Sequence, residues 1–177
     1  MEAIKELYKI GSGPSSSHTI APQRAMKLYI ETFSNANRFV VELYGSLSLT
    51  GKGHFTDYAI KKVCDPFECE VVFKIDWSYD FPSGLIIKGY DDQNALEEWV
   101  VYSLGGGSIK ILNHEIDFQK QVYKEKNLTE IKQFCSVNKT SYYDYCYQQE
   151  EGLYDYLEKI LEAMFLAIDR GLEAEGL

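Results

Sequence analysis

Phe39-Val40-Val41-Glu42-Leu43 is a short apolar run that predicts a β-strand near residues 38–44. Before it, apolar side chains recur at helical spacing and predict a helix over 19–34. Pro22 is compatible with that helix because it falls in the first turn, where no backbone N–H is needed. The sequence therefore predicts a helix followed by a strand in the first quarter of the chain.

After this strand the pattern predicts a loop and then a short helix near 56–63, with Thr56 as its cap and Asp65-Pro66 as its end. Runs rich in Val, Ile and aromatic residues follow and predict strands, with turn signals between them: 70–76, 84–90, 98–102 and 108–112. The expected fold class is α+β, an antiparallel-rich sheet with flanking helices.

From about residue 127 the periodicity becomes helical, and the apolar face of the last helix contains Leu157, Ile160, Leu161, Met164 and Ile168. Gly171 is expected to stop this helix, and the tyrosine-rich segment 142–151 is expected to be a linker or a packed surface. The predicted organisation is a domain over 1–122 and a linker with a helical segment over 123–177. The apolar helix face favours self-association, most simply as a homodimer.

Composition excludes several classes of function. The 177 residues have a formal net charge of −9 and contain no basic stripe, which argues against binding nucleic acid or an anionic membrane surface. The sequence has no run of about 18 apolar residues and no signal-peptide pattern at its start, so the protein is expected to be cytoplasmic.

Four cysteines raise the question of a metal site. They are Cys64, Cys69, Cys135 and Cys146, and only the first two are close in sequence. Iron–sulfur clusters need several thiolates that approach one another, so we expect no metal site in this chain and four reduced thiols instead.

The stretch Gly13-Pro14-Ser15-Ser16-Ser17-His18-Thr19 places three serine hydroxyls and an imidazole just before the first long helix. Thr19 is the expected N-cap, and free N–H groups at a helix start attract anions. The alternative is an ordinary polar cap. The hydroxyl cluster predicts a site for a small carboxylate.

A second motif, Tyr44-Gly45-Ser46-Leu47-Ser48-Leu49-Thr50-Gly51-Lys52-Gly53-His54, follows the central strand. It is not a phosphate-binding P-loop. Five residues separate Gly45 from Gly51-Lys52 where that loop has four, and Gly53 follows Lys52 where the loop needs Ser or Thr. Two glycines around Lys52 favour a sharp turn that presents His54, a side chain able to exchange a proton near neutral pH.

Together the motifs resemble the beta region of the iron–sulfur-dependent L-serine dehydratases. Lys9 to Thr19 and Tyr44 to His54 match its two characteristic segments, and Tyr102-Ser103-Leu104-Gly105-Gly106-Gly107 matches a third. The tail, Leu157 to Gly176, is similar to the entry into the family's catalytic alpha region. The resemblance implies a fold like the allosteric substrate-binding domain of some phosphoglycerate dehydrogenases.

The resemblance also implies a reaction, the elimination of water from L-serine to give pyruvate and ammonia. It implies a [4Fe–4S] cluster that acts as Lewis acid and is ligated by an alpha domain or subunit outside this chain, so that this chain alone is inactive. His54 is then the candidate base, Ser15, Ser16, Ser17, His18 and Thr19 hold or border the carboxylate, and Lys52 adds a positive charge.

One segment departs from the family pattern. Phe81-Pro82-Ser83-Gly84-Leu85 stands where many members carry a His and an Asn, which leaves open whether serine is also an allosteric ligand. A regulatory module that binds serine without chemistry of its own is therefore the main alternative. A Ser/His hydrolase that uses Ser16 or Ser17 is a weaker one, because the chain has no Gly-x-Ser-x-Gly elbow.

Overall fold

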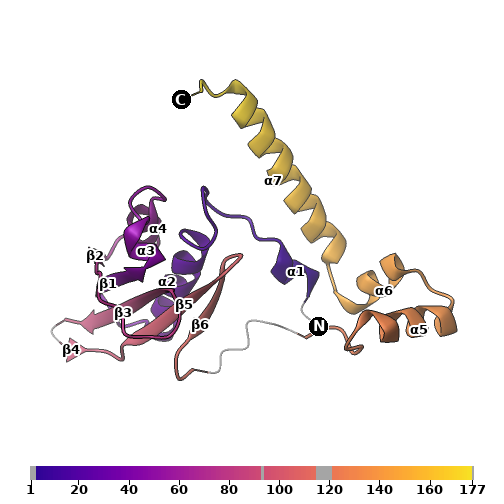
Figure 1. Ribbon diagram of the computed structural model, residues 1–177, viewed down its shortest axis with the longest axis horizontal. Helices are drawn as coiled ribbons and strands as arrows, with labels where there is room; N and C mark the ends of the chain where they lie inside the picture. The colour runs from indigo at the N-terminus through magenta and orange to yellow at the C-terminus, as the bar shows by residue number, and fades with distance from the viewer. Residues whose placement is uncertain (1–2, 93, 115–120, 177) are drawn as a thin grey trace. The chain divides into compact units, whose positions relative to one another are not determined.

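The computed structural model describes residues 3–92, 94–114 and 121–176, which fall into two compact units (Figure 1). The sheet unit spans Gly11–Ile116, and the helical unit combines the start of the chain up to Ile10 with the segment from Asp117 onward.

The sheet unit contains one mixed sheet. The strands run in the spatial order β2-β1-β3-β5-β6, and β4 pairs with β3 beside this path. Their bounds are β1 Arg38–Gly45, β2 Glu68–Phe73, β3 Ser83–Asp91, β4 Asn94–Ala95, β5 Trp99–Gly105 and β6 Ser108–Ile111. The expected strands are all present within a few residues, and the antiparallel-rich α+β fold is confirmed.

One pair in the described sheet is parallel, between β1 and β2, with Phe39 beside Cys69 and Leu43 beside Phe73. The chain between these strands passes through α3 (Ser46–Leu49) and α4 (Thr56–Cys64) and therefore returns in the same direction. The motif from Tyr44 to His54 thus lies on a β-α-β crossover rather than on a simple loop.

Helices α2 (Ile20–Thr32) and α4 pack on one face of the sheet (Figure 1). That face carries the fully buried side chains of alternate strand residues, among them Phe39, Val41, Leu43, Leu85, Ile87 and Val101. Tyr29 of α2 reaches the backbone of the sheet: its hydroxyl donates to the Glu97 carbonyl at 2.6 Å and accepts from the Gly89 N–H at 2.9 Å. A Cβ at Gly89 would lie 2.6 Å from the tyrosine ring, so this close approach requires glycine.

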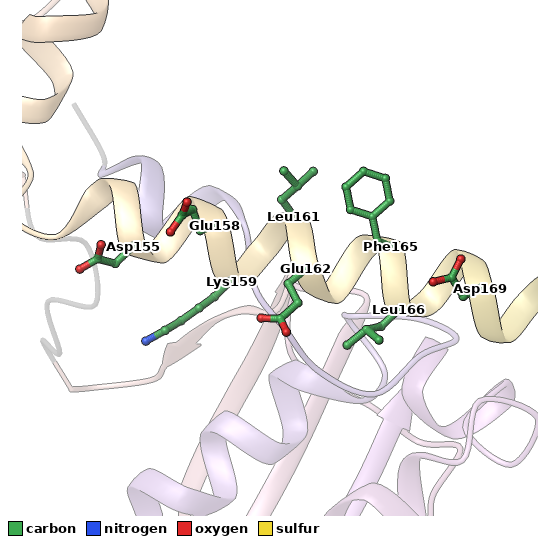
Figure 2. Close-up of a pocket in the computed structure, with 8 residues that line it drawn as sticks. All are labelled: Asp155, Glu158, Lys159, Leu161, Glu162, Phe165, Leu166 and Asp169. Atoms are coloured by element: carbon green, nitrogen blue, oxygen red, sulfur yellow. The ribbon is translucent and has the colours of Figure 1, made fainter.

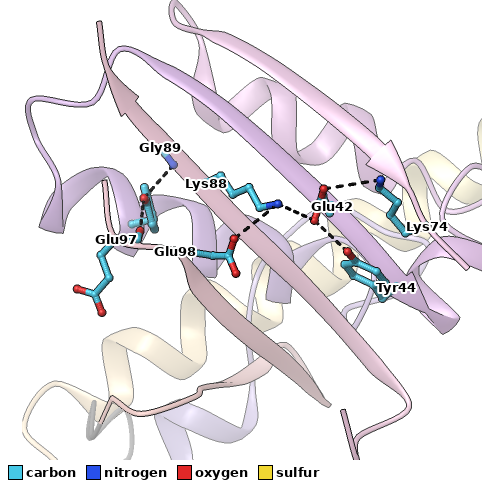
Figure 3. A network of polar contacts seen from close by, with 8 residues as sticks. Glu42, Tyr44, Lys74, Lys88, Gly89, Glu97 and Glu98 are labelled. Atoms are coloured by element: carbon cyan, nitrogen blue, oxygen red, sulfur yellow. Dashed lines mark hydrogen bonds and ion pairs between the residues drawn. The ribbon is translucent and has the colours of Figure 1, made fainter. Parts of the chain in front are cut away.

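The opposite face of the sheet carries a network of charged side chains (Figure 3). Glu42 of β1 accepts from Lys88 of β3 at 3.1 Å and from the Tyr44 hydroxyl at 2.9 Å, and Lys74 lies 3.9 Å away. Glu98 lies 3.6 Å from the same Lys88 ammonium. A single carboxylate, Glu42, therefore ties β1 to its neighbours.

One predicted cap is in place and one is wrong. Thr19 is the N-cap residue of α2 as predicted, but its side chain makes no capping bond, because its hydroxyl bonds backward to the carbonyls of Ser12 and Ser15. Thr56 is the first residue of α4 rather than its cap, and its buried hydroxyl has no hydrogen-bond partner in the described part of the chain. Phe55, in the left-handed conformation with φ of 57°, precedes α4 instead.

The helical unit contains α1 (Ile4–Leu7), α5 (Leu128–Asn138), α6 (Tyr142–Gln149) and α7 (Leu153–Glu173). The segment expected as a linker thus holds a helix. Its Tyr145 is 1% exposed and stacks with Tyr123 at 5.7 Å, so part of the tyrosine-rich patch is core. Glu150 accepts from the N–H groups of Ile4 and Lys5 and from the Tyr123 hydroxyl, which fixes α1 in this unit.

Gly171 does not end α7, which continues to Glu173. Ile160 of the expected apolar face is buried, whereas Leu161 and Met164 are about half exposed. Figure 2 shows Leu161 and Phe165 projecting from the same side of α7. None of the helices in the described residues is both long enough and apolar enough to span a membrane.

Candidate functional site

The serine motif forms a helical turn that leads into α2. The Ser15 carbonyl accepts from the N–H groups of His18 and Thr19, at 3.1 and 2.9 Å. The first N–H that bonds back into the turn is therefore that of His18, and the open donors of the turn belong to Ser16 and Ser17. These open donors lie within the predicted carboxylate segment Ser15 to Thr19.

His18 is 8% exposed and lies at the centre of a hydrogen-bond network. Its Nδ1 lies 3.2 Å from the Ser15 hydroxyl and 3.1 Å from the Ser17 hydroxyl. Its Nε2 lies 2.8 Å from the Thr50 hydroxyl, which itself donates to the Ser46 carbonyl at 2.9 Å. Because the Thr50 proton is used there, Nε2–H must be the donor to Thr50, and Nδ1 accepts from a serine.

Ser16 differs from its two neighbours. In the described residues its hydroxyl has no hydrogen-bond partner, and the side chain is partly exposed. Ser15 and Ser17 are engaged with His18 and with one another, at 3.1 Å between their hydroxyl oxygens. The motif therefore divides into two serines that orient the imidazole and one that can meet a ligand.

His54 is partly exposed and is oriented by the backbone. Its Nδ1 lies 2.8 Å from the Thr50 carbonyl, and its own N–H donates to the same oxygen at 3.2 Å. A carbonyl oxygen only accepts, so Nδ1 carries the proton and Nε2 keeps its lone pair. Nε2 has no partner within the described residues. This is the arrangement of a side chain ready to accept a proton.

The two predicted histidines are brought together. Their rings stack with 4.4 Å between centroids and 27° between planes. Burial lowers the pKa of His18, the contact with the Ser46 carbonyl opposes that shift, and the neighbouring His54 lowers the pKa further. A neutral His18 beside His54 keeps the pair free of like-charge repulsion near neutral pH.

Thr50 is a site residue that sequence reasoning missed, although it stands inside the second motif. Its hydroxyl accepts from His18 and its carbonyl from His54, so it holds both rings. The nearest sequence signal was its place four residues before His54, the spacing at which a helical turn brings a carbonyl to a side chain.

The third motif meets the first. Ser103 of β5 is 3% exposed, and its hydroxyl donates to the Ser17 carbonyl at 2.9 Å. This bond attaches the serine turn to the sheet. The next glycines, Gly105, Gly106 and Gly107, all have positive φ and form the turn into β6. The motif therefore anchors the serine turn.

Gly45 sets the direction of the second motif. It has φ of 55°, and a Cβ there would lie 2.0 Å from the Pro82 carbonyl oxygen, which accepts from the Ser46 N–H at 3.1 Å. The chain can leave β1 and enter α3 this close to the 82–83 turn only with glycine at this position. Segment 81–85, which departs from the family pattern, is thus packed against the motif from Tyr44 to His54.

Lys52 is not directed at the serine turn. Its ammonium lies 2.7 Å from the Asp57 carboxylate and 4.7 Å from the centre of the Phe73 ring. Burial raises the pKa of Asp57, but the Lys52 contact and a backbone N–H outweigh it and lower the pKa. Lys52 therefore pairs with Asp57 in the first turn of α4, and in the described residues its ammonium has no hydrogen bond to His18 or His54.

The described cysteines do not fit an iron–sulfur cluster. Cys64 and Cys69 lie in the sheet unit, while Cys135 and Cys146 lie in the helical unit. In residues 3–92, 94–114 and 121–176 no group of three or more His, Cys, Asp or Glu side chains is placed to hold a metal ion. A [4Fe–4S] cluster needs more closely placed thiolates than this chain offers there.

Comparisons with known proteins agree with the motifs. Residues 3–72 match the family model described as the serine dehydratase beta chain. The chain is 30% identical over 188 residues to L-serine dehydratase 1 of Escherichia coli strain K12, an alignment that covers 80% of this chain and 41% of that relative. It is 29% identical to an L-serine dehydratase of Haemophilus influenzae, over 78% of this chain and 41% of that protein.

A shorter segment is more similar. L-serine dehydratase 2 of Escherichia coli is 50% identical over 66 residues, which are 34% of this chain and 14% of that relative. The chain thus spans about two fifths of the length of the curated relatives that it matches most broadly.

Proposed function

We propose that this chain, an L-serine dehydratase beta region by the family match and the relatives above, binds the carboxylate of L-serine and removes its α-proton. One observation carries the proposal: the two histidines of separate motifs stack at 4.4 Å, and of these two only His54 keeps an uncommitted ring nitrogen among the described residues.

Ser16 and the open N–H groups at the start of the serine turn receive the substrate carboxylate. The positive end of the α2 dipole supports an anion there without a lysine, since Lys52 is paired with Asp57. The neutral His18 does not add charge; it fixes the serines on either side of Ser16.

His54 acts as the general base. Its Nε2 takes the α-proton, the electron pair of that C–H bond forms the Cα–Cβ double bond, and the β-hydroxyl leaves with the C–O electrons. The product is aminoacrylate, which hydrolyses to pyruvate and ammonia. The Thr50 carbonyl holds Nδ1–H and accommodates the charge that His54 gains.

The proposal places the [4Fe–4S] cluster on an alpha domain or subunit outside this chain, because the described cysteines do not fit one. Only carboxylate binding and proton transfer are assigned to the residues of this chain, in a cytoplasmic enzyme. The match to about two fifths of each relative's length supports a partner region of this kind.

The test compares single variants in the enzyme assembled with its alpha region. His54→Ala should lower turnover by roughly 10²- to 10⁴-fold, the usual contribution of a positioned base, with a much smaller change in KM. Ser16→Ala should instead raise KM, by about tenfold for a lost hydrogen bond to a charged group. His114→Ala is the matched control, because His114 contacts Glu97 and is not part of the stacked pair.

Two results would redirect the proposal. Near-normal turnover by His54→Ala with loss of serine-dependent activation would favour the regulatory binding module. Covalent labelling of Ser17 by a fluorophosphonate would favour the hydrolase alternative, for which the 3.1 Å contact between Ser17 and His18 is the supporting observation. The orienting partner of His18 is a threonine hydroxyl rather than a carboxylate, which argues against that alternative.

A further inference from the structure

Two cysteines lie at the junction of α4 and β2, outside the histidine site. Cys64 is the last residue of α4 and is fully buried, and Cys69 is the second residue of β2 and partly exposed. Between them the chain reverses, with the Phe67 N–H donating to the Cys64 carbonyl at 2.8 Å. The end of the helix and the start of the strand are therefore adjacent.

The strand register brings the two thiols to the same side of the sheet. Cys69 stands beside Phe39, whose side chain is fully buried under the helices. Side chains alternate along a strand, so Glu68 and Glu70 face the opposite side and Cys69 faces the helix-covered one. There its thiol neighbours that of Cys64, and each thiol shifts the pKa of the other.

The two thiols are electrostatically unequal. The interaction with the Cys64 thiol lowers the pKa of Cys69, burial opposes this shift, and the Lys61 ammonium lowers the pKa further. The same interaction and its own burial raise the pKa of Cys64. Cys69 is thus the partly exposed thiol with the lowered pKa, and Cys64 is the buried thiol with the raised pKa. An accessible low-pKa cysteine with a second thiol at hand is the arrangement of an oxidation-sensitive pair.

We propose that Cys64 and Cys69 form a reversible oxidation site for hydrogen peroxide. The Cys69 thiolate attacks the peroxide oxygen and becomes a sulfenic acid, while the O–O bond breaks and water leaves after protonation. The Cys64 sulfur then attacks the Cys69 sulfur, the S–O bond breaks, a second water leaves and a disulfide joins α4 to β2. Two thiols are oxidised, and one peroxide is reduced to two waters.

The helical unit supplies an internal reference. Cys135 is buried, its thiol donates to the Ser141 carbonyl at 3.9 Å, and burial raises its pKa. It therefore lacks the features that activate Cys69, and we expect it to stay reduced under the same treatment.

The experiment uses the 177-residue chain, mild hydrogen peroxide, alkylation of the remaining thiols under denaturing conditions, trypsin and mass spectrometry. Cleavage after Lys62 and Lys74 leaves Cys64 and Cys69 in one peptide, 63–74, whereas Cys135 and Cys146 fall in separate peptides. We expect peptide 63–74 to lose two hydrogens and both alkyl groups before the other cysteines change, and dithiothreitol to restore them.

Two variants separate the roles of the thiols. Cys64→Ser should leave Cys69 as a sulfenic acid that dimedone traps, and Cys69→Ser should leave Cys64 reduced. Oxidation of Cys69 no faster than Cys135 in the unaltered chain, or a disulfide to a cysteine outside 63–74, would overturn the proposal. Both of these measurements use the unaltered chain and do not depend on whether a variant folds.

Discussion

Ser103→Ala tests whether the sheet holds the serine turn in place. The Ser103 hydroxyl is the donor that links β5 to the Ser17 carbonyl, at 2.9 Å, and the side chain is 3% exposed. Alanine removes that donor and leaves the rest of β5 unchanged. Water cannot easily replace the hydroxyl at such a buried position.

The magnitude follows from the burial. A neutral hydrogen bond contributes about 1 kcal/mol net, and an acceptor that is left buried without a donor costs about 1–3 kcal/mol. We therefore expect Ser103→Ala to lower the free energy of unfolding of the sheet unit by about 1–3 kcal/mol. With a urea m-value of about 1–3 kcal/mol per molar, the midpoint should fall by roughly 1 M.

The assay exploits the positions of the two tryptophans. Trp77 and Trp99 are the only two in the sequence and both lie in the sheet unit, so their emission reports the unfolding of that unit alone. Ser34→Ala, at an exposed position after α2, is the matched control and should change the free energy by less than about 0.5 kcal/mol. If Ser103→Ala unfolds within 0.5 kcal/mol of this control, the turn does not depend on the sheet for its position.

Three further predictions concern the same unit. Gly45→Ala should destabilise the sheet unit by about 3 kcal/mol or more in urea unfolding, because φ is positive there and the new Cβ would lie 2.0 Å from a backbone oxygen. Gly53→Ala is the control and should be nearly neutral, because its Cβ would lie 3.6 Å from the nearest atom. Burial raises the pKa of Glu42, but the hydrogen bonds from Lys88 and the Tyr44 hydroxyl outweigh burial and lower the pKa. Ionised Glu42 therefore stabilises the sheet unit above the ordinary carboxyl pKa, and this stabilisation is lost as the pH falls through the lowered pKa of Glu42. Glu42→Gln should therefore flatten the loss of urea stability below about pH 4.5, and an unchanged pH slope would contradict this reading. In a nitrogen-15 NMR titration, His18 should titrate below about 6.5 with the proton on Nε2; a higher pKa or an Nδ1–H tautomer would refute the network.

The strands were predictable because their residues satisfy a local rule. Phe39, Val41 and Leu43 alternate with less buried neighbours, and the structure buries all three on the helix-covered face. Period-2 burial depends on the strand alone, so it can be read without knowing the partners. The partner of a strand is not local in this sense. The parallel pairing of β1 with β2 follows from the crossover through α3 and α4, whose first helix is only four residues long.

The candidate site divides in the same way. The residue types of both histidine motifs were visible in the sequence, and the structure brings His18 and His54 into contact. The role of Thr50 was not visible, because its hydroxyl meets a ring that is 32 positions away. The direction in which the Lys52 side chain points was not visible either, since its ammonium forms an ion pair with Asp57 on the next helix.

Thr50 couples the two histidines through chemically different groups. It holds His18 by its side chain and His54 by its carbonyl oxygen, and that oxygen is present whatever residue occupies the position. The orientation of the proposed base is therefore a property of the backbone between α3 and α4. This backbone requires glycine at position 51, because a Cβ there would lie 2.1 Å from the Leu47 carbonyl oxygen. The orientation of His18 depends instead on three hydroxyls. The proposed base is thus held independently of the serine turn, because the groups that hold the two rings do not compete for the same atoms.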